Sequence, residues 1–341
     1  MYSKKIYSRN EYIDWLKGFA IILVVLGHCW TLDRGLFWLI YRFHMPLFFC
    51  ISGYLFNNKR NFKDFLKIKL KTLIIPYMIF FLISFFITYF LITPISIKDV
   101  LKAFIFNGKY LTTINNWAIW YLPLFFIQSI IFYFITKITN NKVFCIIILI
   151  FSLLTVPTYK FITLYTSNNF IPFSIQVLPA ATFFMGIGQL FKRFKEKFLN
   201  INRTGLSLFS FALFIIGILL SLNNSNHIIS ISTYNYVFSA LFIIPFIIII
   251  TQNNNNKVIT YLGKNSLIIL GLHRIILKIM EVYKLGEFLK EYNITGSLSA
   301  LLITILCIAI VCLINTMYKF IINNYKKIFK INSVNGEHIN F

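Results

Sequence analysis

Five ionisable side chains lie within two neighbouring apolar stretches near the start of the chain. Asp14, Lys17 and His28 occur in the first stretch, and Arg42 and His44 occur in the second. Each stretch is apolar for about twenty residues, the length that a helix needs to cross the hydrocarbon core of a membrane. Ionisable groups inside a membrane span are costly, so they are typical of polar cavities and catalytic sites. The set indicates a polar site in which imidazoles exchange protons beside a fixed guanidinium charge.

The spacing of these residues predicts how they meet. The break between the two stretches is so short that the helices must form an antiparallel hairpin, with His28 near its turn. Eleven steps of about 100° separate Lys17 from His28, so both project from one helix face. Arg42 and His44 lie about 9–12 Å from the turn along the second helix. We therefore expect His28, Arg42 and His44 to meet in the outer half of the hairpin. Taken alone, Lys17 could also be a lysine that extends to the membrane interface, and His28 could be a histidine that only packs between helices.

The hairpin belongs to a much larger set of apolar segments. The chain has 341 residues, of which 58% are hydrophobic, whereas soluble domains contain roughly 45–50% apolar residues. We predict an all-α, polytopic integral membrane protein with about ten transmembrane helices in a single domain over residues 1–341, without an appended soluble domain. The predicted spans are 13–32, 36–56, 73–93, 117–136, 143–157, 170–191, 205–222, 234–251, 258–280 and 297–322.

Positive charge alternates between the connections of these spans. One set of connections, including both ends of the chain, holds 22 Lys and Arg residues, and the opposite set holds 8. This split predicts that both termini lie in the cytoplasm. It also explains the net charge of +23 without nucleic-acid binding. Residues 1–11 are polar and no signal-peptidase site follows the first span, so we expect that span to be retained as an anchor.

The five cysteines carry no metal-ligand spacing. They lie inside or at the edges of apolar spans, which is typical of small buried hydrophobic residues. We predict no metal site.

A basic stretch precedes the third span. Residues 59–71 contain six Lys and Arg residues but one acidic residue, Asp64. The stretch suits a cytoplasmic loop, or a basic mouth that binds a phosphate-rich cofactor. Lys69 and Lys71 lie nearest the span, but they differ by about 200° around a helix, so both cannot face one passage if the segment is helical.

Two later segments supply further candidates. Trp117, Trp120 and Tyr121 open the fourth span from the outer side, as an interfacial aromatic belt or as a stacking platform for a sugar. In the ninth span Ser266 can form hydrogen bonds across helices. His273 and the adjacent Arg274 are deep enough that we expect both to face the bundle.

Taken together, these motifs resemble the membrane acyltransferase-3 family, the polytopic O-acetyltransferases of bacterial surface polysaccharides. The similar pieces are spread in family order over residues 11–275. Two positions depart from the family pattern: Lys17 stands where Arg is common, and Thr72 replaces the second residue of a basic pair that begins at Lys69. The pieces are Asp14-Trp-Leu-Lys17-Gly18 with His28, Arg42-Phe-His44-Met-Pro-Leu-Phe-Phe with Ser52-Gly53, Pro76-Tyr77, Trp120-Tyr-Leu-Pro123, Pro179 with Phe183-Phe184-Met-Gly186, and Gly263-Lys-Asn-Ser266 with His273.

The resemblance implies an O-acetyltransferase of the bacterial inner membrane. Acetyl-coenzyme A would enter from the cytoplasm as a co-substrate, with no tightly bound cofactor, and a glycan or lipid-linked glycan hydroxyl would be the acceptor on the outer side. His28 would be the general base, and Arg42 and His44 would hold the thioester carbonyl or its oxyanion.

The resemblance also suggests how the substrates are held. Lys17 would contact the donor or tune His28, and Lys69 and Lys71 would meet its phosphates. The remaining candidates are substrate-binding or structural positions: Asp14, Trp117, Trp120, Tyr121, Ser266 and His273. The alternative function is a transporter or flippase of lipid-linked glycans, which intramembrane basic residues also suit; inverted repeats or paired broken helices would favour it.

Overall fold

The fold consists of helices throughout the part of the chain that can be described. A computed structural model describes residues 9–165, 172–193, 203–222, 234–251, 254 and 256–334, and no strand occurs among them. The first half contains α1 (Arg9–Gly27), α2 (Arg34–Leu55), α3 (Phe62–Lys69), the π-helical turn η1 (Leu70–Ile74), α4 (Ile75–Ile87), the π-helical turn η2 (Thr88–Ile92), α5 (Ile97–Phe106), the 3₁₀ helices η3 (Gly108–Ile114) and η4 (Trp117–Trp120), α6 (Tyr121–Ile138) and α7 (Asn141–Tyr165). The second half contains the 3₁₀ segment η5 (Pro172–Val177), α8 (Leu178–Arg193), α10 (Arg203–Leu222), α11 (Tyr234–Thr251), α12 (Lys257–Lys264), α13 (Ser266–Val282), α14 (Leu285–Glu291) and α15 (Gly296–Val334).

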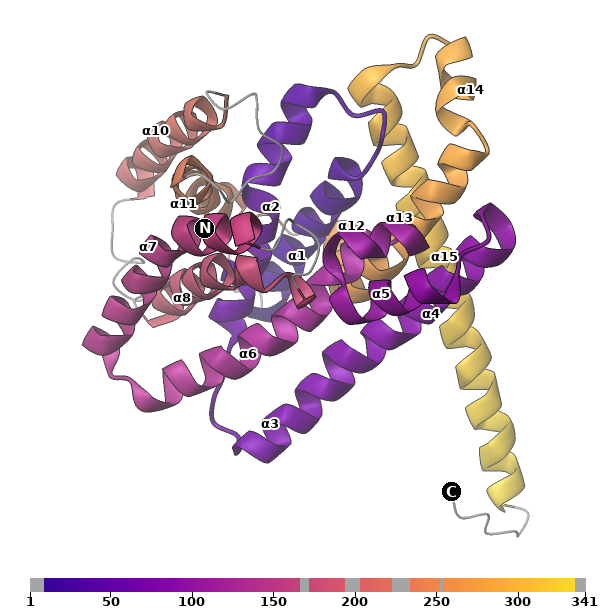
Figure 1. The fold of residues 1–341 in the computed structure, drawn as a ribbon, viewed down its shortest axis with the longest axis horizontal. Coiled ribbons are helices and arrows are strands. Elements are labelled where there is room, and N and C mark those ends of the chain that lie inside the picture. The colour runs from indigo at the N-terminus through magenta and orange to yellow at the C-terminus, as the bar shows by residue number, and fades with distance from the viewer. Residues whose placement is uncertain are drawn as a thin grey trace, which may run out of the picture.

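The α1–α2 hairpin lies in the middle of the bundle (Figure 1). Helix α1 packs against α12, α13 and α15, whereas α2 packs against α8, α10 and α11. The hairpin thus joins two groups of helices that are far apart in the sequence. Side chains on its two faces can therefore take part in sites built from either group.

The prediction of an all-α polytopic membrane protein is confirmed. By length and composition, seven helices among the described residues can cross a membrane. The other predicted spans, 13–32, 205–222 and 258–280, correspond to α1, α10 and the pair α12–α13. The count of ten therefore stays a prediction.

The first helix begins and ends earlier than the predicted span 13–32. Helix α1 ends at Gly27, and the His28 amide closes its last turn by donating to the carbonyls of Val24 and Val25, both at 3.1 Å. The connection to α2 is tied to α15, because the Asp33 carboxylate accepts hydrogen bonds from the backbone amide, at 2.8 Å, and the hydroxyl of Ser297. These bonds lower the pKa of Asp33 below its ordinary value.

The third span begins earlier than predicted. Most of the basic stretch is helical, because α3 begins at Phe62 and continues through η1 into α4. Asn61 caps α3 by accepting a hydrogen bond from the Asp64 amide at 2.9 Å. The lysines of this stretch are therefore placed by helical phase, and not by a flexible loop.

The fifth span does not end at Pro157, as the sequence suggested. Helix α7 continues through this proline to Tyr165. Proline has no amide to donate to the carbonyl four residues earlier, which is that of Leu153. The Tyr234 hydroxyl of α11 donates to this carbonyl at 2.9 Å, which satisfies it from another helix.

The ninth span is interrupted, contrary to the prediction of one helix over 258–280. Asn265 separates α12 from α13. Its side chain donates to the Tyr261 carbonyl at 2.8 Å and accepts from Asn315 at 2.8 Å and Lys319 at 3.0 Å, both on α15. These bonds anchor the break to α15, so that α13 starts afresh at Ser266.

The cysteine prediction is confirmed for three of the five residues. Cys29, Cys50 and Cys307 are buried, but Cys145 is exposed and Cys312 is intermediate. All five are free thiols.

Candidate active site

The turn end of the α1–α2 hairpin brings His28 against α2. The Tyr41 hydroxyl lies 3.0 Å from His28 Nδ1, and the Tyr41 ring meets the His44 ring edge to face at 4.9 Å. Tyr41 and His44 are three residues apart and share one face of α2. The structure thus brings His28 and His44 together through Tyr41.

Helix α13 adds a second imidazole beside His28. The ring centroids of His28 and His273 are 5.3 Å apart, and His273 is fully buried. Its Nδ1 lies 2.9 Å from the Ile269 carbonyl and 3.0 Å from the Leu270 carbonyl. Since carbonyls only accept, Nδ1 must carry a proton, and Nε2 of the neutral ring is left as an acceptor. That Nε2 is buried and has no hydrogen-bond partner among the described residues.

The 3₁₀ helix η4 adds Trp117, which packs on both His28 and Arg274. The Trp117 ring lies 5.9 Å from the His28 ring, and the Arg274 guanidinium carbon lies 3.5 Å above the Trp117 ring. The neighbouring Asn116 fixes η4, because its side-chain amide donates to the Ser84 hydroxyl at 2.7 Å and to the Gly271 carbonyl at 2.8 Å. The stacked pair is therefore held against α4 and α13.

Arg274 has unused hydrogen-bonding capacity. It is only 7% exposed, and its Nε and Nη1 atoms have no partner among the residues that the structure describes. Buried polar groups are nearly always hydrogen-bonded, so such donors indicate a place where a ligand oxygen binds. We define the histidine cluster as His28, Tyr41, His44, Trp117, His273 and Arg274.

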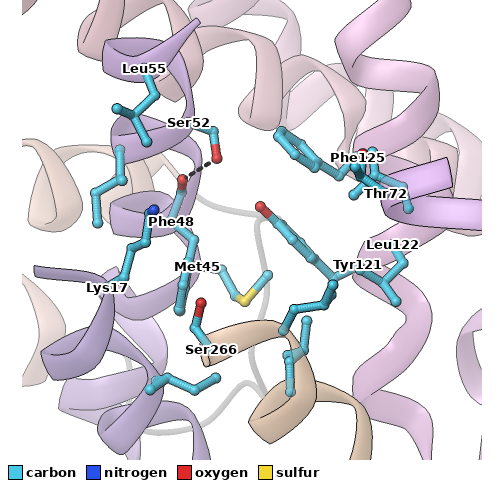
Figure 2. A pocket seen from close by; sticks show the side chains of 15 residues that line it. Lys17, Met45, Phe48, Ser52, Leu55, Thr72, Tyr121, Leu122, Phe125 and Ser266 are labelled. Carbon is cyan, nitrogen blue, oxygen red and sulfur yellow. Dashed lines mark hydrogen bonds between the residues drawn. The ribbon is translucent and has the colours of Figure 1, made fainter. Parts of the chain in front are cut away.

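A cavity of about 230 Å³ lies between α1, α2, α6 and the start of α13. Figure 2 shows polar groups that reach it from different elements: Lys17 from α1, Ser52 from α2, Tyr121 from α6 and Ser266 from α13. The Ser52 hydroxyl donates to the Phe48 carbonyl at 2.8 Å. Most of the remaining lining is apolar: Ile21, Met45, Phe48, Ile51, Leu55, Thr72, Leu73, Leu122, Phe125, Leu267 and Leu270. Three predicted residues from separate segments, Lys17, Tyr121 and Ser266, thus share this cavity.

The cavity and the histidine cluster are neighbours along two helices. Met45 lines the cavity and directly follows His44, and Leu270 lines it one helical turn before His273. One turn of helix spans about 5 Å. An acyl group held in the cavity would therefore lie close to the imidazoles.

The predicted basic residues divide into two groups. The Lys69 ammonium lies 4.9 Å from the ring centroid of Phe125, which lines the cavity, whereas Lys71 is exposed. This agrees with the expectation that one helical segment cannot direct both toward one passage. Lys17 lies at the cavity itself and forms an ion pair with Asp14 at 3.1 Å.

Arg42 and Trp120 also lie outside both sites. Arg42 is buried on α2 but interacts electrostatically with Tyr236 of α11. It does not join His28, because positions 42 and 44 are about 200° apart around a helix. Trp120 packs edge to face on Tyr121 at 6.4 Å and does not line the cavity. The sequence had placed Arg274 toward the bundle but had not connected it with His28.

This arrangement defines a polytopic membrane protein with a buried imidazole cluster beside a largely apolar cavity. The acyltransferase domain family matches residues 10–316. The chain therefore belongs to this family and is a multi-pass membrane protein, as the resemblance in the sequence suggested. That result favours an acyltransferase over a transporter.

The similarity to an individual protein is more limited. Nodulation protein NolL of Sinorhizobium fredii is 50% identical over 58 residues, which cover 14% of this chain and 16% of NolL. The chain thus matches about a sixth of the length of this relative. No solved structure matches the chain.

Proposed function

We propose that the protein is an O-acetyltransferase of the bacterial inner membrane. It moves an acetyl group from cytoplasmic acetyl-coenzyme A to a sugar hydroxyl of a surface polysaccharide or of its lipid-linked precursor. The observation that carries this proposal is the proximity of two sites, the cavity and the histidine cluster, whose residues lie within about one turn of each other along α2 and α13. A thioester acyl group suits the largely apolar cavity, and a hydroxyl suits the unpartnered groups of the cluster.

His28 is the general base in this proposal. Its Nδ1 carries the proton of the neutral ring and donates a hydrogen bond to the Tyr41 hydroxyl, which lies 3.0 Å away. The acceptor hydroxyl gives its proton to Nε2 while its oxygen attacks the thioester carbon. When the carbon–sulfur bond breaks, the coenzyme A thiolate takes the proton from His28, which returns to its neutral form. His44 supports Tyr41 through the edge-to-face ring contact.

The remaining candidates bind the substrates. Lys17, paired with Asp14, and Ser266 contact the donor in the cavity. Lys69 binds a phosphate of coenzyme A at the cytoplasmic entrance, and the exposed Lys71 assists by long-range attraction. Trp117 and Trp120 face the acceptor side, and Tyr121 orients the acyl group.

The direct test is acetyl transfer by purified protein in lipid vesicles. Acetyl-coenzyme A carrying a labelled acetyl group is supplied on one side, together with glycan from cells that lack the gene. Label in the glycan, with a mass increase of one acetyl group per modified sugar, is the expected result. Release of label only as acetate, or transport of unmodified glycan, would contradict the proposal.

Lys69→Gln is expected to raise the KM for acetyl-coenzyme A about tenfold with little change in kcat. A hydrogen bond to a charged group is worth about 1.5–3 kcal/mol, and 1.4 kcal/mol corresponds to a tenfold change in binding. Loss of a ground-state contact changes KM and leaves kcat nearly constant. Initial rates at varied donor concentration measure both constants.

Lys67→Gln is the matched control, because Lys67 is exposed on the same helix. It is expected to retain the KM of the unmodified protein. If Lys69→Gln changes only the amount or orientation of protein in the membrane, the basic helix is a topology signal and not a donor site.

The proposed orientation has its own test. A reporter fused after Asn58 is expected to be cytoplasmic, and one fused after Thr93 to be outside, because positive charge favours the cytoplasmic face. Two further fusion points lie outside the described residues: Asn200, expected in the cytoplasm, and Asn224, expected outside. A reversal at any of these points would contradict cytoplasmic termini and the outer position of His28.

A further inference from the structure

We infer that Arg274 binds the oxyanion that forms on the acyl carbonyl during transfer. The inference rests on the proposed function and assigns to Arg274 a role that the sequence had suggested for Arg42. Three features carry it: the position of Arg274 beside His28, its burial with unused donors, and its fixed orientation on Trp117.

Arg274 lies beside His28, the proposed general base. Trp117 contacts the His28 ring at 5.9 Å and the Arg274 guanidinium carbon at 3.5 Å. Arg274 follows His273, whose ring lies 5.3 Å from that of His28. Since the hydroxyl that His28 deprotonates must attack the carbonyl carbon, the carbonyl oxygen must also lie near His28. Arg42 lies about 200° from His44 around α2, so it points away from this place.

Because Arg274 is buried, it is better suited to bind the oxyanion formed in the reaction than a permanent anionic group of the acceptor. Arg274 is only 7% exposed, and its Nε and Nη1 lack partners among the described residues. A carboxylate or phosphate that remains on the glycan would bring its own desolvation cost into this site. The oxyanion instead forms inside the site, where a donor in a water-poor surrounding has its greatest effect.

The orientation of Arg274 is fixed before the reaction. The indole face of Trp117 supports the guanidinium by a cation–π contact, and the two hydrogen bonds of Asn116 hold η4 in place. A donor that needs no reorganisation stabilises the transition state more than the bound ground state.

The step balances without a further reactant. The hydroxyl proton moves to His28 Nε2, the new carbon–oxygen bond forms, and the carbonyl electron pair moves to oxygen, where Arg274 donates hydrogen bonds. Collapse restores the carbonyl and breaks the carbon–sulfur bond. The departing thiolate then takes the proton from His28.

The test compares Arg274→Gln and Arg274→Lys with the matched control Lys278→Gln. Lys278 lies one turn further along α13 and pairs with Glu281 at 3.1 Å. Arg274→Gln is expected to lower kcat by about 10²–10³-fold, the effect of removing one oxyanion donor. Arg274→Lys is expected to recover part of this loss, because it keeps the charge but not the planar geometry. Lys278→Gln is expected to retain kcat.

Binding separates this role from a structural one. The Kd of a dethia analogue of acetyl-coenzyme A, in which a methylene replaces the thioester sulfur, is expected to be unchanged in Arg274→Gln. An unchanged kcat, or a raised KM for the acceptor with kcat retained, would overturn the inference. If both Arg274 variants fail to fold, Trp117→Phe takes their place: kcat is expected to fall several-fold while the Kd of the dethia analogue stays unchanged, and an unchanged kcat would again overturn it. Failure of the unmodified protein to transfer acetyl groups would instead refute the proposed function.

Discussion

Replacing His28 with alanine is expected to lower kcat for acetyl transfer by about 10²–10⁴-fold, the usual contribution of a general base. The substitution removes the ring that contacts Tyr41, Trp117 and His273. His28 lies just beyond the end of α1, so its loss is expected to leave helix formation and membrane insertion intact. Transfer rates are measured at equal amounts of membrane-inserted protein.

The control for His28→Ala is binding of the dethia analogue, whose Kd is expected to stay unchanged. A kcat equal to that of the unmodified protein would remove His28 from the mechanism. In that case His273→Ala becomes the decisive variant, because the Nε2 of His273 is also available to accept a proton, as its Nδ1 donates to backbone carbonyls.

The α1–α2 hairpin was largely predictable from the sequence. Apolar length fixes the two helices, and the short break between them fixes their antiparallel pairing, which is how His28 and His44 come together through Tyr41. The same helical geometry argues against Arg42 as a partner of His28, since residues 42 and 44 point in nearly opposite directions. The prediction counted the depth of Arg42 along the helix but not its angle around the helix axis.

The cavity was less predictable, because it depends on contacts between distant segments. Each of Lys17, Tyr121 and Ser266 carried a motif signal, but nothing in the local sequence placed them around one space. The interruption at Asn265 depends on Asn315 and Lys319 of α15, and the passage of α7 through Pro157 depends on Tyr234. Tertiary hydrogen bonds decide such features, so a pattern of apolar residues alone cannot locate them.

The second large effect is expected from Gly53→Ala, which should separate α2 from α8. A Cβ atom at Gly53 would lie 1.8 Å from the Met185 carbonyl oxygen, and one at Gly188 of α8 would lie 1.8 Å from the Cys50 carbonyl oxygen. The two backbones are therefore in direct contact, as small residues permit in membrane bundles. Because the clash is with backbone and not with a flexible side chain, we expect a cost at or above the usual 1–3 kcal/mol of overpacking.

Gly53→Ala should therefore lower both the Tm of the purified protein and its transfer activity, because α2 carries His44 and several cavity residues. Gly188→Ala should act in the same way from the opposite helix. The matched control is Gly35→Ala, in the first turn of α2, where an added Cβ meets no atom within 4 Å. That variant should keep its Tm and activity, since alanine favours a helix more than glycine does. If Gly53→Ala behaved like Gly35→Ala, the close packing of α2 on α8, and with it the position of the cavity residues of α2, would be wrong.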